Sequence, residues 1–250
     1  MDHQNNIDIE KLSEDKQKIK GRFSPIIVTI IIAAWLIGVS ILGAGWLISR
    51  EIREQGSVNK DSGSQINTDQ TPVQIDIPRY KSQLGSDDAK VTVIEFADFQ
   101  CPFCGEWHKT IFPKMESEYI QTGKVKFIYW DLAFLGDESI KAAEAAVCAK
   151  DQGKFWEYHD RLFDGQFGEN QGAFSDDNLK KIALELGVDS VIFNKCFDTR
   201  LYKDLIEESN NLSQKYGVNS TPTVFINGIR TEGVMPYENY KQIIDSELAK

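Results

Sequence analysis

The stretch Phe96-Ala97-Asp98-Phe99-Gln100-Cys101-Pro102-Phe103-Cys104 places two cysteines three residues apart, between an apolar run and a segment with helical periodicity. The apolar run, Val91–Phe96, is rich in β-branched and aromatic residues, which is typical of a buried strand. Pro102 suits the first turn of a helix, because a backbone N–H at that position has no helical partner in any case. We therefore expect Cys101 to lie at the amino terminus of a helix that follows a strand.

A cysteine at the start of a helix is chemically activated. Free backbone N–H groups and the helix macrodipole stabilise negative charge there. We expect the thiolate of Cys101 to form below the free-cysteine pKa of about 8.5, and the thiolate is the nucleophile of thiol chemistry. Cys104 lies one turn further on, where it can close a disulfide with Cys101 and should be more shielded. The spacing thus predicts that Cys101 attacks and that Cys104 resolves.

Two other interpretations of this cysteine pair stay open. A Cys-x-x-Cys pair can form half of a zinc site. However, only His108 offers a further ligand within the segment, and Cys148 and Cys196 do not form a second closely spaced pair. The other interpretation is an inert structural disulfide in a tight turn. We expect neither a metal nor a cofactor.

Two further positions could serve the same chemistry. Glu95 lies six residues before Cys101, where strand alternation could place its carboxylate beneath the cysteine pair. Burial would raise its pKa and let it carry the proton of Cys104, whereas the alternative is a partly exposed acid or an ion pair with a lysine. Pro222 directly precedes another strand-like run. It is either an ordinary edge-strand proline or a cis-proline at a functional turn.

The order of the predicted elements indicates an α/β fold. Four runs have the character of strands: Val91–Phe96, Val125–Trp130, Thr223–Asn227 and Ile229–Thr231. Helical periodicity covers about 101–119 (interrupted at Pro113), 137–150, 154–164, 176–187, 189–197, 200–216 and Tyr237–Ala249. Together they predict a small mixed sheet with helices on both faces and a helical insert at about 136–217.

Charge and composition limit the class of protein. Apolar residues make up 41% of the chain and charged residues 26%, as in ordinary globular proteins. There are 38 acidic and 28 basic residues, which gives a net charge of −10. We expect no nucleic-acid partner, because affinity for phosphates depends on Lys and Arg.

The amino-terminal part predicts a membrane anchor. Residues 23–49 contain no charged side chain, and the apolar run Ile26–Ile48 is long enough to cross a bilayer as a helix. Five Lys and Arg residues lie in the fifteen positions before this span and three in the fifteen after it, so the amino terminus should stay in the cytoplasm. We expect a cytoplasmic tail at 1–22, a transmembrane helix at 23–49 and a flexible linker at 50–72, which is rich in Gly, Ser, Asn and Gln.

Two alternatives to this anchor stay open. A cleaved signal peptide normally has a shorter apolar core and a shorter polar tail before it. A buried core helix rarely stays free of charge over this length. With the anchor in place, residues 73–250 form one exported domain, in a bacterial periplasm or on the outer surface of the cell.

Taken together, these motifs resemble the DsbA-like branch of the thioredoxin superfamily over about residues 75–250. The resemblance rests on the Cys101–Cys104 motif, on Glu95, on Thr221-Pro222 before the third strand, and on the insert sequence Gly153-Lys154-Phe155-Trp156-Glu157-Tyr158-His159-Asp160. It implies a thioredoxin fold with an inserted helical subdomain, here preceded by a single transmembrane helix. It also implies that Pro222 is cis beside the disulfide and that the backbone of Thr221 pairs with substrate.

The resemblance further implies a membrane-anchored thiol:disulfide oxidoreductase. The expected activity is that of a dithiol oxidase, which introduces disulfides into the cysteine thiols of exported proteins and is reoxidised by a DsbB-like or VKOR-like membrane partner. One position departs from the best-known oxidase of the family, because Phe103 replaces a histidine whose charge favours the thiolate; the change should make the disulfide less oxidising. A reductase or isomerase of the same fold therefore stays open, as does an exported binding or chaperone module without redox activity.

The other two cysteines, Cys148 and Cys196, lie on separate helices of the insert. In an oxidising compartment we expect them to form a structural disulfide; two buried thiols or a second redox pair are the alternatives. We expect surface or packing roles for His108 and His159. Four aromatic residues of the insert should belong to the core: Phe155, Trp156, Tyr158 and Phe163.

Overall fold

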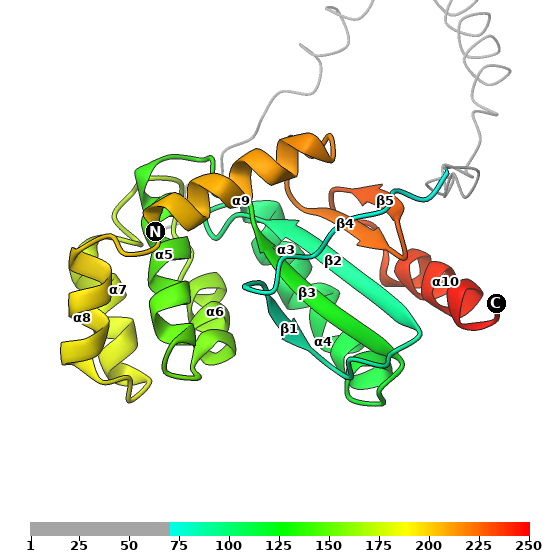
Figure 1. The fold of residues 1–250 in the computed structure, drawn as a ribbon, viewed down its shortest axis with the longest axis horizontal. Coiled ribbons are helices and arrows are strands. Elements are labelled where there is room, and N and C mark those ends of the chain that lie inside the picture. The colour runs from blue at the N-terminus through cyan, green and yellow to red at the C-terminus, as the bar shows by residue number, and fades with distance from the viewer. Residues whose placement is uncertain (1–70) are drawn as a thin grey trace, which may run out of the picture. The chain divides into compact units, whose positions relative to one another are not determined.

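A computed structural model describes residues 71–250, which form a five-stranded sheet with helices against both faces (Figure 1). The strands are β1 (Ser82–Leu84), β2 (Val91–Ala97), β3 (Val125–Asp131), β4 (Thr223–Ile226) and β5 (Ile229–Glu232). The helices are α3 (Pro102–Thr110), α4 (Phe112–Met115), the π-helical turn η1 (Glu116–Ile120), α5 (Asp137–Lys150), α6 (Phe155–Asp164), α7 (Asp176–Glu185), α8 (Ser190–Asp198), α9 (Lys203–Lys215) and α10 (Tyr237–Leu248). This is the α/β order that the sequence predicts.

The segments expected at the amino terminus fall almost entirely outside this range. The cytoplasmic tail at 1–22, the transmembrane helix at 23–49 and all but the last two residues of the linker at 50–72 lie outside the described residues. Within residues 71–250, no helix combines the length and the apolar character that a membrane span requires. The anchor therefore stays a prediction from the sequence.

The sheet has the strand order β1-β3-β2-β4-β5. Strands β2 and β3 are parallel, and α3, α4 and η1 connect them; the other pairings are antiparallel. In this register Glu95 of β2 lies between Tyr129 of β3 and Val224 of β4. Neighbouring strands thus hold the carboxyl-terminal part of β2, which leads to the cysteine pair, from both sides.

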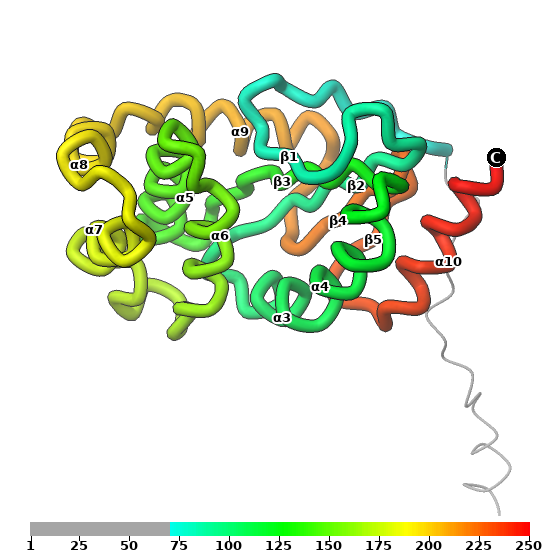
Figure 2. Tube along the Cα trace, turned by 90° about the horizontal axis from the view of Figure 1, so that it is seen from below, coloured from blue at the N-terminus to red at the C-terminus, as the bar shows by residue number. Residues whose placement is uncertain are grey.

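Strand β2 is buried on both faces, which explains its nearly continuous apolar sequence. Val93 and Ala97 belong to the larger core, together with residues of α3 and α10. Ile94 and Phe96 point to a second core on the opposite face, completed by the end of α9 and by the segment before β1. Figure 2 shows α3 and α10 on one side of the sheet and α9 on the other.

Helices α5 to α9 form the helical insert, and α5 to α8 lie beyond one end of the sheet (Figure 1). Helix α5 is rich in alanine and buried over most of its length, so its neighbours approach it closely. A disulfide bond joins Cys148 of α5 to Cys196 of α8, across 48 positions of sequence. The expected bond is thus present, and it ties two helices of the insert together.

The interruption expected at Pro113 is present: α3, α4 and η1 divide the helix expected at about 101–119, and Pro113 lies in the first turn of α4, where it cannot donate a backbone hydrogen bond. Two features differ from the sequence prediction. The helix expected at 200–216 begins only at Lys203, since Arg200 adopts a positive φ of 52° that no helix continues. Strand β1 was not predicted, because its three residues are too few to show the alternation of apolar and polar side chains that marks a strand.

Candidate active site

Cys101 occupies the N-cap position of α3, four residues after β2 ends. Its backbone is extended (φ −67°, ψ 119°), and its carbonyl oxygen accepts a helical hydrogen bond of 3.1 Å from the N–H of Gly105. Its own N–H donates to the carbonyl oxygen of Asp98 at 3.0 Å. Cys101 and Cys104 are free thiols in this structure, with 5% and 0% of their surfaces exposed.

The surroundings of Cys101 favour its thiolate. The side-chain hydrogen bond from Cys104 contributes most; Thr221 and the backbone N–H groups of Phe103 and Cys104 add to it, while burial acts in the opposite direction. The net effect lowers the pKa of the Cys101 thiol to about 6. Cys101 is therefore mostly ionised at neutral pH and ready to act as a nucleophile or as a leaving group.

Cys104 and Glu95 have the opposite character. Burial, followed by the hydrogen bond to Cys101, raises the pKa of the Cys104 thiol well above its ordinary value. Burial, followed by the charge of Cys101, likewise raises the pKa of the Glu95 carboxyl, which is only 2% exposed. Among residues 71–250, the Oε1 atom of Glu95 has no hydrogen-bond partner. The site therefore holds one ionised sulfur beside two groups that retain their protons.

The segment before β4 borders the site from another part of the chain. The peptide bond between Thr221 and Pro222 is cis. The Sγ atom of Cys101 lies 3.4 Å from the carbonyl oxygen of Thr221, and in its thiol form it donates a hydrogen bond to that oxygen. Of the two interpretations of Pro222, the structure thus shows a cis-proline whose preceding residue contacts Cys101.

A buried carboxylate that the sequence analysis did not select holds the loop after β2. Asp98 is 1% exposed. Its Oδ1 accepts hydrogen bonds from the backbone N–H of Gln100 at 2.8 Å and from the hydroxyl of Ser139 at 2.6 Å. Its Oδ2 accepts from the backbone N–H groups of Phe134 and Leu135 at 2.9 and 3.1 Å. The position of Asp98 between a predicted buried strand and a reactive cysteine is the sequence feature that could have indicated its role.

Two amide side chains continue this network into the helical insert. The side chain of Gln100 donates to the hydroxyl of Ser139 at 2.8 Å and accepts from the backbone N–H of Asn170 at 2.6 Å. The side chain of Gln166 donates to the backbone carbonyl oxygens of Phe99 and Cys101. Because Gln166 and Asn170 lie far from the cysteines in sequence, no local spacing indicates them.

Among the described residues, one group of side chains has the spacing of metal ligands. His108, His159 and Asp160 place one ligand atom each within 4.8 Å of one another. Nδ1 of His159 already pairs with the Asp160 carboxylate at 2.9 Å, and both imidazoles pack against the ring of Phe163. Burial lowers the pKa of both imidazoles, that of His108 to about 4. We interpret the group as the packing contact expected for the two histidines, between α3 and α6.

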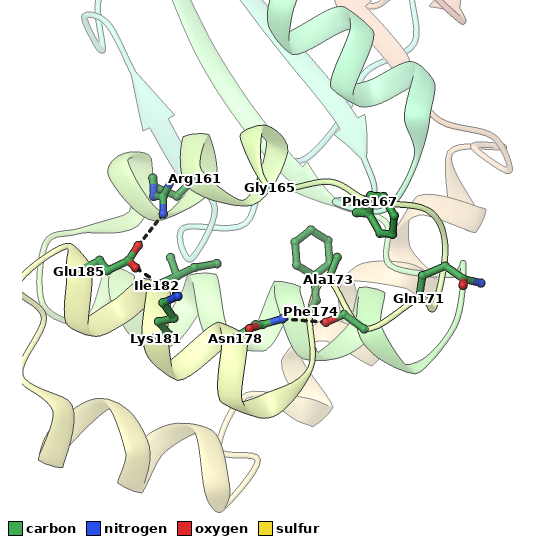
Figure 3. A pocket seen from close by; sticks show the side chains of 11 residues that line it. Arg161, Gly165, Phe167, Gln171, Ala173, Phe174, Asn178, Lys181, Ile182 and Glu185 are labelled. Carbon is green, nitrogen blue, oxygen red and sulfur yellow. Dashed lines mark hydrogen bonds and ion pairs between the residues drawn. The ribbon is translucent and has the colours of Figure 1, made fainter.

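The expected aromatic core of the insert is largely present: Phe155, Tyr158 and Phe163 are buried and Trp156 is partly buried. A separate hollow of about 440 Å³ lies beside α6 and α7 (Figure 3). Phe167 and Phe174 border it, together with the ion pair between Arg161 and Glu185. Neither cysteine of the pair lines this hollow.

The arrangement at Cys101 fits one reaction. A thiol of low pKa forms a thiolate that readily attacks a disulfide and readily leaves one. A second thiol one turn away can form a disulfide with it, so electrons pass between this pair and an external dithiol. A protein that carries this pair on such a sheet is a thiol:disulfide oxidoreductase.

Comparison with known proteins agrees with that class. Residues 79–246 match a family described as thioredoxin. Disulfide bond formation protein D of Bacillus subtilis (strain 168) is 33% identical over 180 residues, which cover 68% of this chain and 79% of that protein. The probable disulfide bond formation protein D of Bacillus cereus is 32% identical over 174 residues, covering 68% and 80%.

Solved structures show the same fold. The crystal structure of oxidised BdbD from Bacillus subtilis superposes with a TM-score of 0.65 at 30% identity, over 68% of this chain and 94% of that one. Alpha-DsbA1 of Wolbachia pipientis, at 23% identity, shares the fold with a TM-score of 0.63, over 70% and 94% of the two chains. The chain belongs to the thioredoxin family. It is a DsbA-like thiol:disulfide oxidoreductase, and so an enzyme rather than a binding module without redox activity.

Proposed function

We propose that the protein is a dithiol oxidase that introduces disulfides into exported proteins through a reversible Cys101–Cys104 disulfide. The observation that carries this proposal is the lowered pKa of Cys101 beside the raised pKa of Cys104. A stabilised thiolate stabilises the reduced enzyme, so the disulfide form becomes the stronger oxidant. The names of the two Bacillus relatives support the same direction of electron flow.

In the first step, a substrate thiolate attacks Sγ of Cys101 in the oxidised enzyme. A bond forms between the two sulfurs, the Cys101–Cys104 bond breaks, and Cys104 leaves with the electron pair. Because burial disfavours the Cys104 thiolate, this sulfur takes up a proton. Glu95 is buried, its raised pKa favours the protonated carboxyl, and no described residue bonds its Oε1, which suits it to supply that proton.

In the second step, another thiolate of the substrate attacks the substrate sulfur of the mixed disulfide. The bond to Cys101 breaks, and Cys101 leaves as the thiolate that its surroundings stabilise. The substrate has lost two electrons and two protons and holds a new disulfide. The enzyme has gained both electrons. Cys104 holds the proton that Glu95 supplied, Glu95 takes one of the two substrate protons back from solution, and the other stays in solution.

Thr221 and Pro222 serve substrate binding in this proposal. The carbonyl oxygen of Thr221 lies 3.4 Å from Sγ of Cys101, so a polypeptide that reaches this sulfur runs beside the Thr221 backbone. Backbone pairing there would hold many different substrates, because main-chain groups are common to all of them.

The proposal places the enzyme at the cell membrane. Residues 23–49 would span the bilayer, with the amino terminus in the cytoplasm and residues 73–250 outside it. The charge-free run and the excess of Lys and Arg before it support this orientation. A membrane quinone reductase of the DsbB or VKOR type would accept the two electrons, and a shared membrane would raise the effective concentration of the two proteins.

The equilibrium of the Cys101–Cys104 pair with glutathione tests the direction of electron flow. An oxidase should have a reduction potential well above about −200 mV. It should also form disulfides in a reduced, unfolded protein when supplied in its oxidised form, and Cys101→Ser should abolish this activity. A potential near −270 mV, together with rapid reduction of insulin, would instead identify a reductase.

One observation favours a reductase or isomerase as the second candidate. Phe103, between the two cysteines, is 58% exposed and offers no charge to the Cys101 thiolate. A less stabilised thiolate makes the disulfide less oxidising. An isomerase would convert scrambled disulfides without a net change in thiol content, which separates it from both other activities.

A further inference from the structure

We infer that Gln166, in the loop after α6, is a positioning residue for the cysteine pair, because its side-chain amide fixes the backbone that presents Cys101 to substrate. The helical insert would thereby take part in setting the redox properties of the dithiol. This inference rests on the proposed role of Cys101 as the attacking sulfur.

The amide of Gln166 reaches the active-site loop at two points. Its Nε2 donates to the carbonyl oxygen of Phe99 at 2.7 Å and to that of Cys101 at 3.1 Å. Both acceptors are carbonyl oxygens, so the NH₂ end of the amide must face them. One side chain thus joins the insert to the residues on either side of Gln100.

The carbonyl oxygen of Cys101 has two donors. The N–H of Gly105 approaches it at 3.1 Å in the first turn of α3, and Gln166 approaches from outside the helix. These donors use both lone pairs of the oxygen. They draw negative charge away from a group next to the Cys101 thiolate, and they hold the turn whose N–H groups, from Phe103 and Cys104, stabilise that sulfur.

Gly105 leaves the space that this amide occupies. A Cβ atom at position 105 would lie 2.0 Å from Oε1 of Gln166 and 2.8 Å from its Cδ. Glycine inside a helix is less favourable than alanine, and Gly105 is not among the glycines with a positive φ. Room for the Gln166 amide is therefore a reason for glycine at this position.

Gln166→Ala should make Cys101 less acidic and the disulfide less oxidising. The loss of a hydrogen bond of this kind corresponds to about a three- to tenfold change in an equilibrium constant. We expect a change of that size in two equilibria. The ionisation of Cys101 should shift toward the thiol, and the equilibrium with glutathione should shift toward the Cys101–Cys104 disulfide. Gln166 is only partly buried, so the variant should fold.

Gln171→Ala is the matched control. It removes the same kind of side chain from the same loop, but Gln171 is exposed and its amide donates to the carbonyl oxygen of Glu169 at 3.4 Å instead of to the active-site loop. Two other groups that titrate lie beside Cys101, the Cys104 thiol and the Glu95 carboxyl. Glu169 lines a hollow together with Pro102 and Gln166. None of the variants alters them.

A double-mutant cycle isolates the contact between the two elements. Gly105→Ala should displace the Gln166 amide and reproduce the shift seen in Gln166→Ala. In the Gln166→Ala background it should add little, because the new methyl group then meets free space. A gain in thermal stability from alanine in the helix would not change this result, since the readouts are ionisation and redox equilibrium.

The experiment measures the Cys101 pKa from the ultraviolet absorbance of the thiolate, the glutathione equilibrium and the melting temperature of all five proteins. Shifts in Gln166→Ala and Gly105→Ala that are not additive, with Gln171→Ala unchanged, support the inference. A lower melting temperature with unchanged pKa and potential would overturn it. A wild-type Cys101 that ionises like free cysteine would instead contradict the proposed function itself.

Discussion

Sγ of Cys101 lies 3.4 Å from the carbonyl oxygen of Thr221, although 120 positions separate the two residues in sequence. The contact brings the start of α3 together with the segment that enters β4, and both follow from the central position of β2 in the sheet. The reactive sulfur is therefore shielded on the protein side and bordered by a main-chain carbonyl. That environment suits exchange with a cysteine on an extended polypeptide.

Cys104→Ser should accumulate mixed disulfides between Cys101 and exported proteins. Without Cys104 the enzyme forms no internal disulfide, so the adduct arises when the Cys101 thiolate attacks and breaks a disulfide of a substrate, and no Cys104 thiol is present to displace the bound protein. Non-reducing gels and mass spectrometry of the captured proteins provide the measurement, with Cys101→Ser as the control that forms none. Adducts in Cys101→Ser and none in Cys104→Ser would reverse the roles of the two sulfurs.

Glu95→Gln should stabilise the reduced enzyme above about pH 5. Because the Glu95 pKa is raised in the folded state, the unfolded chain ionises first, and stability falls as pH rises through and above the unfolded value of about 4.3. Each unit of difference contributes about 1.4 kcal/mol, and glutamine carries no such penalty. Urea unfolding at pH 4 and pH 8 measures the effect.

The same variant should exchange disulfides more slowly, since Cys104 loses its proton donor. Wild type should lose more stability than Glu95→Gln between the two pH values. An identical loss in both proteins would mean that Glu95 is not held protonated by burial.

Phe103→His should make the disulfide more oxidising. A protonated imidazole beside the thiolate contributes about 1.5–3 kcal/mol as a charged hydrogen bond, which corresponds to about 30–60 mV for this two-electron couple. Phe103 is largely exposed, so the substitution should not disturb the core. The glutathione equilibrium gives the potential, and Phe103→Leu is the uncharged control. Equal potentials for all three proteins would contradict the electrostatic explanation.

Replacement of Cys148 and Cys196 together by alanine should lower stability without altering the reactive pair. The bond closes a loop of 48 residues, for which the chain-entropy model gives about 4 kcal/mol. Urea unfolding should show this loss, whereas the potential of the Cys101–Cys104 pair should match wild type. A large change in that potential would mean that the second disulfide takes part in the redox cycle.

Local signals in the sequence predicted the part of the site that is local in the chain. The strand before Cys101 and Pro102 at the start of the helix both follow from short-range preferences, as do the helix boundaries of α5 at Asp137 and Lys150. The position of Glu95 follows from strand alternation, whereas the cis form of Pro222 and the role of Thr221 also needed the resemblance to a known family.

The polar residues that hold the site could not be predicted in this way. Gln166 is 65 positions from Cys101, and a hydrogen bond between a side chain and a distant carbonyl leaves no periodic trace. In the sequence, Gly105 is only a residue that weakens a helix; the structure shows that it leaves room for the Gln166 amide. Asp98 was within the quoted motif, but three of its four donors come from Phe134, Leu135 and Ser139, whose approach only the fold defines.

The pH dependence of Cys101 alkylation in the reduced wild-type enzyme tests the central claim most directly. The account predicts that the rate rises with a midpoint near pH 6, as the thiolate forms, and that Cys104 stays unmodified because it is buried and protonated. The reduced enzyme should also gain stability as pH rises from about 6 toward the free-cysteine value. A midpoint near about 8.5, as for free cysteine, would contradict the account.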